Sequence, residues 1–175
     1  MFYLYFRTIQ CLIYGFFGNK IHPSSVTRRT FFCNFFDTDW FNGMQSGAFF
    51  SYTDASRWEV AIRCGFFWPS LKKGWVIIVA GQRVIYRRRL AIFRKFILET
   101  QIVGCDDKWI YQVQKFKQKG DTKCIVFSKL GIRAQAKLFS PRQVIQDLGI
   151  IDMPLPPLYI TQAFSDDLKL YEQAH

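Results

Sequence analysis

The sequence predicts an α+β domain in which an antiparallel β-sheet wraps around one long central helix. Three observations lead to this fold class. A strand-like run at 30–36 leads into a helix-compatible segment at 46–66, and the chain then reads as successive strands and turns to about residue 132. The apolar side of the long helix is rich in aromatic residues, so a curved sheet is needed to cover it. The length of 175 residues suits one domain.

We divide the chain into an N-terminal helix and linker at 1–29, a sheet-and-helix domain at 30–150 and an extended C-terminal tail at 151–175. Half of the residues are hydrophobic and 18% are aromatic, which is enough to build a full core.

The first 18 residues form an apolar segment with helical spacing, and we expect an amphipathic helix there. Its apolar positions are Phe2, Tyr5, Phe6, Ile9, Leu12, Ile13, Phe16 and Phe17. The segment is too short and too polar for a transmembrane helix, which needs roughly 20 apolar residues. No positive region or small-residue cleavage site marks it as a signal peptide. Two alternatives remain open: the helix docks on the domain, or it lies on a membrane surface, aided by Lys20, Arg28 and Arg29.

The segment 21–29 reads as a linker because His22-Pro23 and Ser24-Ser25 break regular structure. The apolar side of the helix at 46–66 combines Phe49, Phe50, Thr53, Trp58, Ala61 and Ile62. Gly65 is a plausible stop for this helix, because glycine readily adopts the left-handed conformation after a last turn.

The second half reads as four strands, which we place at 75–90, 96–103, 109–118 and 123–132. Turns are expected at 104–108 and at Lys119-Gly120-Asp121, the latter a tight hairpin. In the third strand Trp109, Tyr111 and Val113 alternate with Gln112 and Gln114, which is typical of a half-exposed antiparallel strand.

After the strands, Ser140-Pro141 predicts the start of a short helix that ends near Gly149. Residues 153–157 read as an extended tail. Ser165-Asp166-Asp167 reads as the cap of a last short helix.

The formal charge of +11 favours an anionic partner, which could be nucleic acid, an acidic lipid headgroup or a phosphorylated small molecule. The alternative is that the charge only makes the solvated surface basic. Nucleic acid is not expected, because the basic residues are scattered and no RNA- or DNA-binding motif is present.

The five cysteines are odd in number and lack a Cys-x-x-Cys pair, which disfavours a disulfide framework or a zinc site and favours a reduced, cytoplasmic protein. The two histidines, His22 and His175, lie in peripheral segments, so a Ser-His-Asp site is not expected. An enzyme of this composition would use a carboxylate.

Three sequence stretches carry a resemblance to a known family. They are Asp37-Thr38-Asp39; Thr53-Asp54-Ala55-Ser56-Arg57 with Trp58 and Arg63-Cys64-Gly65; and 93–109, which contains Glu99-Thr100 and Gly104-Cys105-Asp106-Asp107-Lys108-Trp109. With the order of elements, they resemble the hotdog fold, in particular the bacterial thioesterase-like subgroup of the 4-hydroxybenzoyl-CoA thioesterase-like branch. The match runs to about Gly149. One departure is present: the subgroup carries His-Met-Asn-Asn before the helix, where this chain has Gly43-Met44-Gln45-Ser46.

The resemblance implies an acyl-CoA thioesterase in which Asp39 is the catalytic carboxylate, acting on water or directly on the thioester. The alternative for Asp39 is a capping role in its own turn. A thioester carbonyl would bind at the free N–H groups of the helix start, formed by Gln45, Ser46 and Gly47. Ser46 has the alternative role of a plain helix cap.

Other residues complete the expected site. Asp54 is either a second carboxylate or the ion-pair partner of Arg57, three residues further along the helix. The basic residues Arg87, Arg88 and Arg89 either bind the phosphates of coenzyme A or form a solvated strand edge. The expected acyl pocket is formed by Trp40, Phe41, Phe49 and Phe50, with Tyr52 as a further candidate; core packing is the alternative for these side chains.

The sequence therefore predicts an acyl-CoA thioesterase that needs no metal or cofactor, since coenzyme A enters as part of the substrate. The alternative is a non-catalytic acyl-CoA or lipid-binding hotdog protein, favoured by the altered His-Met-Asn-Asn motif. We expect a homodimer or a dimer of dimers with composite sites. We also expect a cytoplasmic location, with peripheral membrane contact through residues 1–18 as the alternative.

Overall fold

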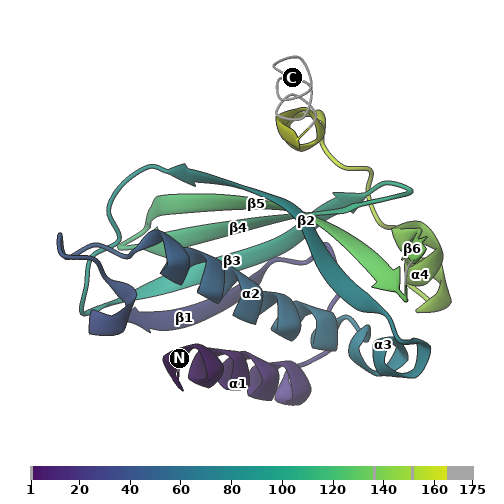
Figure 1. The fold of residues 1–175 in the computed structure, drawn as a ribbon, viewed down its shortest axis with the longest axis horizontal. Coiled ribbons are helices and arrows are strands. Elements are labelled where there is room, and N and C mark those ends of the chain that lie inside the picture. Colours follow the sequence, from purple (N-terminus) through teal and green to yellow (C-terminus); the bar gives the residue numbers. More distant parts are fainter. Residues whose placement is uncertain (1, 136, 151, 165–175) are drawn as a thin grey trace.

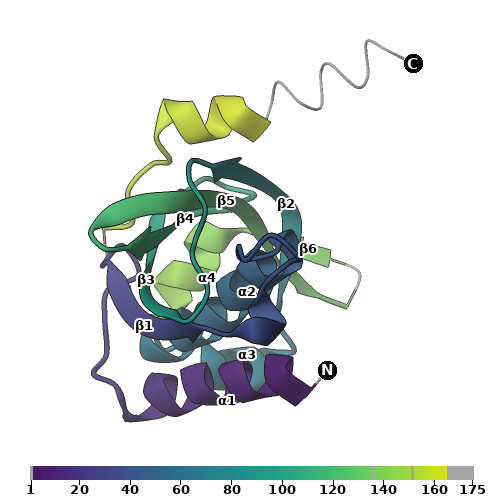
Figure 2. The ribbon, with the colours of Figure 1, turned by 90° about the vertical axis from the view of Figure 1, so that its left-hand side faces the viewer.

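The computed structural model describes residues 2–135, 137–150 and 152–164 (Figure 1). Its elements are α1 (Phe2–Phe17), β1 (Thr27–Cys33), η1 (Phe35–Asp37), α2 (Ser46–Arg63), α3 (Phe67–Lys73), β2 (Val76–Tyr86), β3 (Arg94–Cys105), β4 (Ile110–Gln118), β5 (Asp121–Ala134), β6 (Lys137–Phe139) and α4 (Pro141–Asp147). The strands form one antiparallel sheet in the order β1-β3-β4-β5-β2, with β6 paired to β5. The sheet curls around α2, and α1 lies on the side of α2 that faces away from the sheet (Figures 1 and 2).

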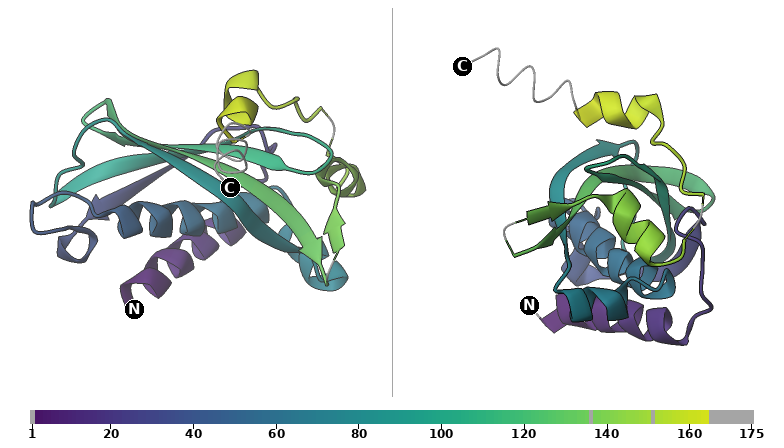
Figure 3. Two further views of the ribbon diagram at one scale, coloured as in Figure 1. Left: turned by 45° about the horizontal axis from the view of Figure 1, so that its top comes forward. Right: turned by 90° about the vertical axis from the view of Figure 1, so that its right-hand side faces the viewer.

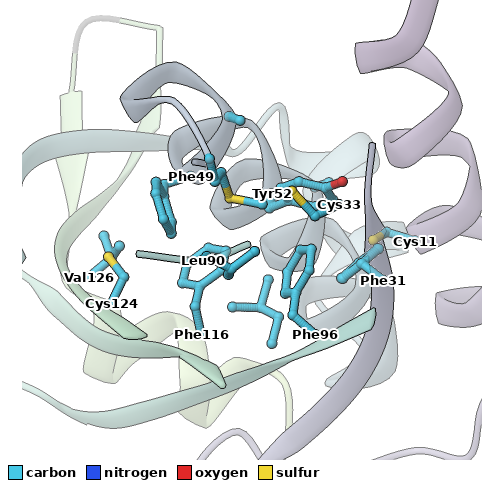
Figure 4. Close-up of a cluster of buried hydrophobic side chains, with 14 residues drawn as sticks. Cys11, Phe31, Cys33, Phe49, Tyr52, Leu90, Phe96, Phe116, Cys124 and Val126 are labelled. Carbon is cyan, nitrogen blue, oxygen red and sulfur yellow. The ribbon is translucent and has the colours of Figure 1, made fainter. Parts of the chain in front are cut away.

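Helix α2 begins at Ser46 as predicted and ends at Arg63, just before the predicted stop. Gly65 has φ +78°, a conformation that glycine adopts without the steric cost of a Cβ, and the chain turns there. The short helix α3 follows and was not predicted from the sequence. The core lies between α2 and the sheet, where Phe49 and Tyr52 of α2 pack against Phe96 and Phe116 of the strands (Figure 4).

The predicted strands are all present, with shifted ends. The hairpin between β4 and β5 has a two-residue loop, Lys119-Gly120, in which both residues have positive φ, as a type I′ turn requires. Strand β2 ends at Tyr86, so the prediction of a strand to residue 90 is wrong over its last four residues. The arginines Arg87, Arg88 and Arg89 therefore lie in the β2–β3 loop, and not on a strand edge.

Strand β4 is covered on both faces, so the prediction of a half-exposed strand is wrong. Gln112 and Gln114 are buried on the side that faces α2, where Gln114 Nε2 donates to Ser56 Oγ at 2.7 Å. Tyr111 and Val113 are buried on the other side, against Ile160. Ile160 belongs to residues 158–164, which are helical and lie over the outer face of the sheet, in a part of the tail predicted to be extended (Figures 2 and 3). The predicted cap at 165–167 lies outside the described residues.

Helix α1 docks on α2, as one of the two alternatives for this segment predicts. The fully buried Cys11 joins the core cluster, and a Cβ at Gly15 would lie 2.8 Å from Cδ1 of Ile62, so the two helices are in close contact. The opposite face of α1 remains apolar and exposed; it presents Tyr5, Phe6, Ile9, Ile13 and Phe17. Within the described residues, no helix combines the length and the apolar character needed to cross a membrane.

Candidate functional site

The residues between β1 and α2 form a tight hairpin that carries Asp39 at its turn. Thr38 and Met44 pair as an antiparallel bridge, and the Asp39 N–H donates to the Gly43 carbonyl at 2.9 Å. The Asp39 Oδ1 accepts from the N–H groups of Phe41 at 2.9 Å and Gly43 at 3.2 Å. Asp39 thus caps its own turn, as the structural alternative proposes, and its carboxylate is exposed on the hairpin.

The base of this hairpin is the start of α2. The Gln45 N–H donates to the Asp37 carbonyl at 2.8 Å, and Gln45 Nε2 donates to the Phe36 carbonyl at 3.2 Å. Gln45 occupies the N-cap position of α2, and its side chain makes no capping hydrogen bond to the helix. Ser46 is the first residue inside the helix, so the alternative role of Ser46 as the helix cap is wrong. A Cβ built on Gly47 meets nothing within 4 Å. Space is therefore open beside Gly47 in the first turn, which carries the positive end of the helix dipole; the Ala48 and Phe49 N–H groups already donate to the Gln45 carbonyl.

The β2–β3 loop packs against the same hairpin. The Met44 N–H donates to the Leu90 carbonyl at 3.1 Å, and Gly43 forms a bridge with Ala91. A Cβ on Gly43 would lie 3.0 Å from Cγ of Arg89, so the Arg89 side chain crosses the hairpin directly beside the Asp39 turn. The fold thus brings the acidic turn, the open helix start and the arginine loop to one end of the molecule, at the left in Figure 1.

All three arginines of this loop are exposed. Arg88 Nη1 lies 3.3 Å from Oδ2 of Asp121, an exposed ion pair that contributes little stability. A guanidinium that is exposed and only loosely paired is available for a phosphate oxygen. The geometry is therefore compatible with the predicted binding of coenzyme A phosphates at Arg87, Arg88 and Arg89.

The four residues predicted to line an acyl pocket do not share one pocket within a single subunit. Trp40 and Phe41 lie on the hairpin and are 100% and 76% exposed. Phe49 is buried in the core against Phe116 and Tyr86, and Phe50 is half-buried. Tyr52 is also a core residue. An acyl pocket that uses the hairpin aromatics would need a second wall from outside this subunit.

Asp54 lies two helical turns from the start of α2, apart from the Asp39 hairpin. Its carboxylate forms an ion pair with the guanidinium of Arg57, as the alternative for this residue predicts. Burial raises the pKa of Asp54 above its usual value and lowers that of Arg57, although each partner opposes the other's shift. Asp54 and Asp39 do not meet in the subunit.

The first acid of the Asp-x-Asp pair is the residue whose role the sequence reasoning missed. Asp37 is completely buried and forms an ion pair with Arg7 of α1. It also accepts from the hydroxyl of Tyr52 at 2.9 Å and from the Asn34 N–H at 3.1 Å. A single arginine within the apolar first helix was the available signal, because a buried cation needs a partner. Asp37 therefore anchors α1 and the hairpin, whereas Asp39 faces solvent.

The other buried ionisable groups have structural partners or are poor nucleophiles. Glu59 of α2 binds Arg29 at 2.7 Å and Arg63 at 3.1 Å. Burial raises the pKa of the Cys11, Cys64 and Cys124 thiols to about 12, so none of these is a thiolate near neutral pH. Among the described residues no cluster of His, Cys, Asp and Glu is suited to hold a metal ion.

A family model described as the thioesterase-like superfamily matches residues 33–143, which is more than half of the chain. The chain belongs to this superfamily. The match contains the Asp39 hairpin, the whole of α2 and the arginine loop. Membership supports a thioesterase-like function in general.

Two relatives and one solved structure illustrate the likeness. Protein THEM6 of Danio rerio is 31% identical over 85 residues, which cover 49% of this chain and 42% of the relative. Protein THEM6 of Xenopus laevis is 28% identical over 112 residues, which cover 64% of this chain and 53% of the relative. The chain thus spans about half the length of these curated relatives.

The solved structure is a thioesterase from Thermus thermophilus complexed with coenzyme A and Zn. It is 17% identical with a TM-score of 0.63, over 77% of this chain and all of the other. At that identity the likeness bears on the fold alone. Together with the family match it confirms the predicted hotdog fold, with the added helix α1.

Proposed function

We propose that this member of the thioesterase-like superfamily hydrolyses acyl-CoA thioesters with Asp39 as its catalytic carboxylate. The observation that carries the proposal is the meeting of three features in one place: the exposed Asp39 carboxylate, the open start of α2 and the arginine loop that packs on the same hairpin. A carboxylate, an electrophile-binding helix start and a phosphate-binding loop are the groups that hydrolysis of an acyl-CoA needs.

In this mechanism the thioester carbonyl oxygen lies at the N–H groups of Ser46 and Gly47. The positive end of α2 stabilises the negative charge that develops on this oxygen, and one such donor is worth roughly 3 kcal/mol in the transition state. In one route Asp39 removes a proton from the attacking water and returns it to the sulfur as the C–S bond breaks, so that coenzyme A leaves as the thiol. In the other, Asp39 attacks the carbonyl carbon itself, the thiolate of coenzyme A leaves and takes a proton from solvent, and water then hydrolyses the acyl-aspartyl anhydride to release the acid and restore Asp39. Arg87, Arg88 and Arg89 hold the coenzyme A phosphates. Neither a metal nor a cofactor takes part.

The proposal includes a homodimer, or a dimer of dimers, with composite sites. Strand β2 pairs with β5 on one side, and no strand of the described residues pairs with its other edge. Exposed apolar side chains line this 11-residue edge strand: Val76, Val79, Ile85 and Tyr86. A long apolar edge of this kind favours pairing with a second sheet. A partner subunit would also supply the wall that Trp40 and Phe41 lack.

The decisive experiment measures thiol release from a panel of acyl-CoAs with the wild-type protein and the Asp39→Asn variant. Asparagine keeps the Oδ1 that accepts from Phe41 and Gly43, so the hairpin retains its shape while the charge is lost. Loss of a general base is expected to lower kcat by about 100-fold or more. Asp147→Asn removes an exposed carboxylate far along the chain and is the matched control. Unchanged turnover in Asp39→Asn would remove this residue from the mechanism.

A second candidate function is acyl-CoA or lipid binding without turnover, at the membrane surface. It is favoured by the exposed apolar face of α1, by the exposed Trp40, and by Gly43-Met44-Gln45-Ser46 in place of the family motif. This candidate predicts acyl-CoA binding with no thiol release at any chain length. It also predicts that Ile9→Ser/Ile13→Ser weakens co-sedimentation with anionic liposomes, while the exposed control Leu155→Ser does not. Either way we place the protein in the cytoplasm or on the cytoplasmic face of a membrane.

A further inference from the structure

The half of α2 remote from the Asp39 hairpin lines a small cavity of about 60 Å³. Aliphatic side chains of α2, the sheet and α4 form most of its wall, among them Val60, Ile132 and Val144. Two polar side chains also reach it: Arg57 from α2 and Gln112 from β4. Arg57 lies eleven residues after Ser46, and at 1.5 Å per residue this is about 16 Å along the helix from the candidate active site.

Both polar side chains have an unused hydrogen-bonding atom. The Nε of Arg57 and the Oε1 of Gln112 are buried and have no partner among the described residues. Gln112 is only 1% exposed. A buried donor or acceptor without a partner costs about 1–3 kcal/mol, so such atoms indicate that something else satisfies them.

A larger groove adjoins this cavity. It has a volume of about 400 Å³, lies between α2, α3 and β2, and shares Arg57, Ala61, Phe66 and Ile77 with the cavity wall. Most of its lining is aromatic or aliphatic, including Trp58 and Trp75, and the ion pair of Asp54 and Arg57 and the side chain of Ser70 complete it. The cavity alone has room for only a few atoms, whereas the groove has the volume of an ordinary small-molecule site. Both lie toward the end of the molecule where α2 meets α3, at the right in Figure 1.

We propose that the cavity and the groove together form a second binding site, for an uncharged amphiphile with one hydroxyl group and an apolar body. The hydroxyl enters the cavity, where its oxygen accepts from Arg57 Nε and its proton is donated to Gln112 Oε1. The apolar body lies in the groove against the aromatic side chains. This site is separate from the proposed catalytic site and does not depend on hydrolysis.

Charge decides in favour of an uncharged head group. Arg57 already forms an ion pair with Asp54, so the pair brings no net charge to the site. A carboxylate head would add an unbalanced negative charge to a largely apolar cavity and would place its lone pairs against the Gln112 acceptor. A hydroxyl provides one acceptor and one donor, which matches the two unused atoms.

The test is calorimetric titration of the whole protein with 1-octanol, octyl methyl ether and octanoate, with the tryptophan fluorescence of the groove as a second readout. The ether still accepts from Arg57 but has no proton to donate to Gln112. We expect 1-octanol to bind at least about tenfold more tightly than either of the others, the factor that one hydrogen bond typically supplies. Equal affinity for alcohol and ether, tighter binding of octanoate, or no binding of 1-octanol would each overturn the proposal.

Two variants locate the site. Gln112→Leu removes the acceptor and keeps the bulk of the side chain, so the affinity for 1-octanol is expected to fall about tenfold while that for the ether stays the same. Gln82→Leu is the matched control, because Gln82 is a half-buried glutamine of β2 that lines neither the cavity nor the groove. If Gln112→Leu bound 1-octanol as tightly as the wild type, the proposal would be wrong. Should that variant fail to fold, the ligand series on the wild-type protein still decides.

Discussion

The buried ion pair between Arg7 and Asp37 leads to a quantitative prediction about how α1 is held on the domain. The Asp37 side chain is completely buried and that of Arg7 is 7% exposed. Removing one member of such a pair leaves a buried charge without its counter-ion, which typically costs about 3–5 kcal/mol. The Arg7 guanidinium also lies 4.0 Å from the centre of the Tyr52 ring, a cation–π contact that the same substitution removes.

We therefore expect Arg7→Met to lower the free energy of unfolding by about 4 kcal/mol, since methionine keeps most of the apolar stem. Asp37→Asn is expected to cost a similar amount, because it leaves the arginine charge buried. The double variant Arg7→Met/Asp37→Asn removes both charges, and the asparagine Oδ1 can still accept from the Tyr52 hydroxyl. The free energy of unfolding of the double variant is expected to fall by only about 1–2 kcal/mol, well below the sum of the two single losses.

Urea denaturation at pH 7, followed by circular dichroism, measures these differences. With a slope of about 2 kcal/mol per molar urea, a loss of 4 kcal/mol lowers the midpoint by about 2 M. The control is Arg88→Met, which breaks the exposed pair with Asp121 and is expected to cost less than about 1 kcal/mol. A stabilising buried pair is refuted if Arg7→Met lowers the free energy of unfolding by no more than Arg88→Met does, or if the losses of the two single variants simply add in the double variant.

Three further predictions concern the sheet. Burial raises the pKa of Glu99, but hydrogen bonds and charges from Lys117 and a neighbouring arginine outweigh it, so the pKa lies below its usual value. Its stabilising effect is therefore present above the unfolded pKa of about 4.3 and is lost as the pH falls through the lower folded pKa. Glu99→Gln should lower the free energy of unfolding by about 1 kcal/mol at pH 7 and by progressively less as the pH falls below about 4. A difference between the two proteins that stays constant as the pH falls, in denaturation curves, would contradict this. Gly104→Ala places a Cβ 2.6 Å from the backbone nitrogen of Pro156, so we expect the free energy of unfolding to fall by about 1–3 kcal/mol, measured by thermal denaturation. An unchanged melting midpoint would show that the backbone at Pro156 does not pack against Gly104. Cys124 is fully buried with a pKa raised to about 12, so it should resist alkylation by iodoacetamide at pH 8 until urea unfolds the chain, as mass spectrometry would reveal.

Local sequence determined some of the boundaries of the regular elements. Gly65 ends the α2 segment and Lys119-Gly120 makes the hairpin between β4 and β5, because each conformation depends on the backbone freedom of residues at that point. Pro141 starts α4 for the same kind of reason, since its fixed φ suits a first helical turn. The alternation of apolar and polar residues also placed β4 correctly as a strand.

Only the tertiary structure decided which side chains of these elements are buried and which meet. The alternation of apolar and polar residues in β4 predicted that Gln112 and Gln114 face solvent. Instead these glutamines are buried under α2, and the apolar residues of β4 face the other side of the sheet, where the helical residues 158–164 cover them. Asp37 and Asp39 are two residues apart in one acidic turn, and each bonds to a nearby backbone N–H. The ion pair with Arg7, thirty residues earlier, makes Asp37 a buried anchor, whereas Asp39 stays exposed. Arg89 lies beside the Asp39 hairpin because Gly43 pairs with Ala91. Burial and charge pairing depend on contacts between distant segments, and short-range sequence patterns do not contain that information.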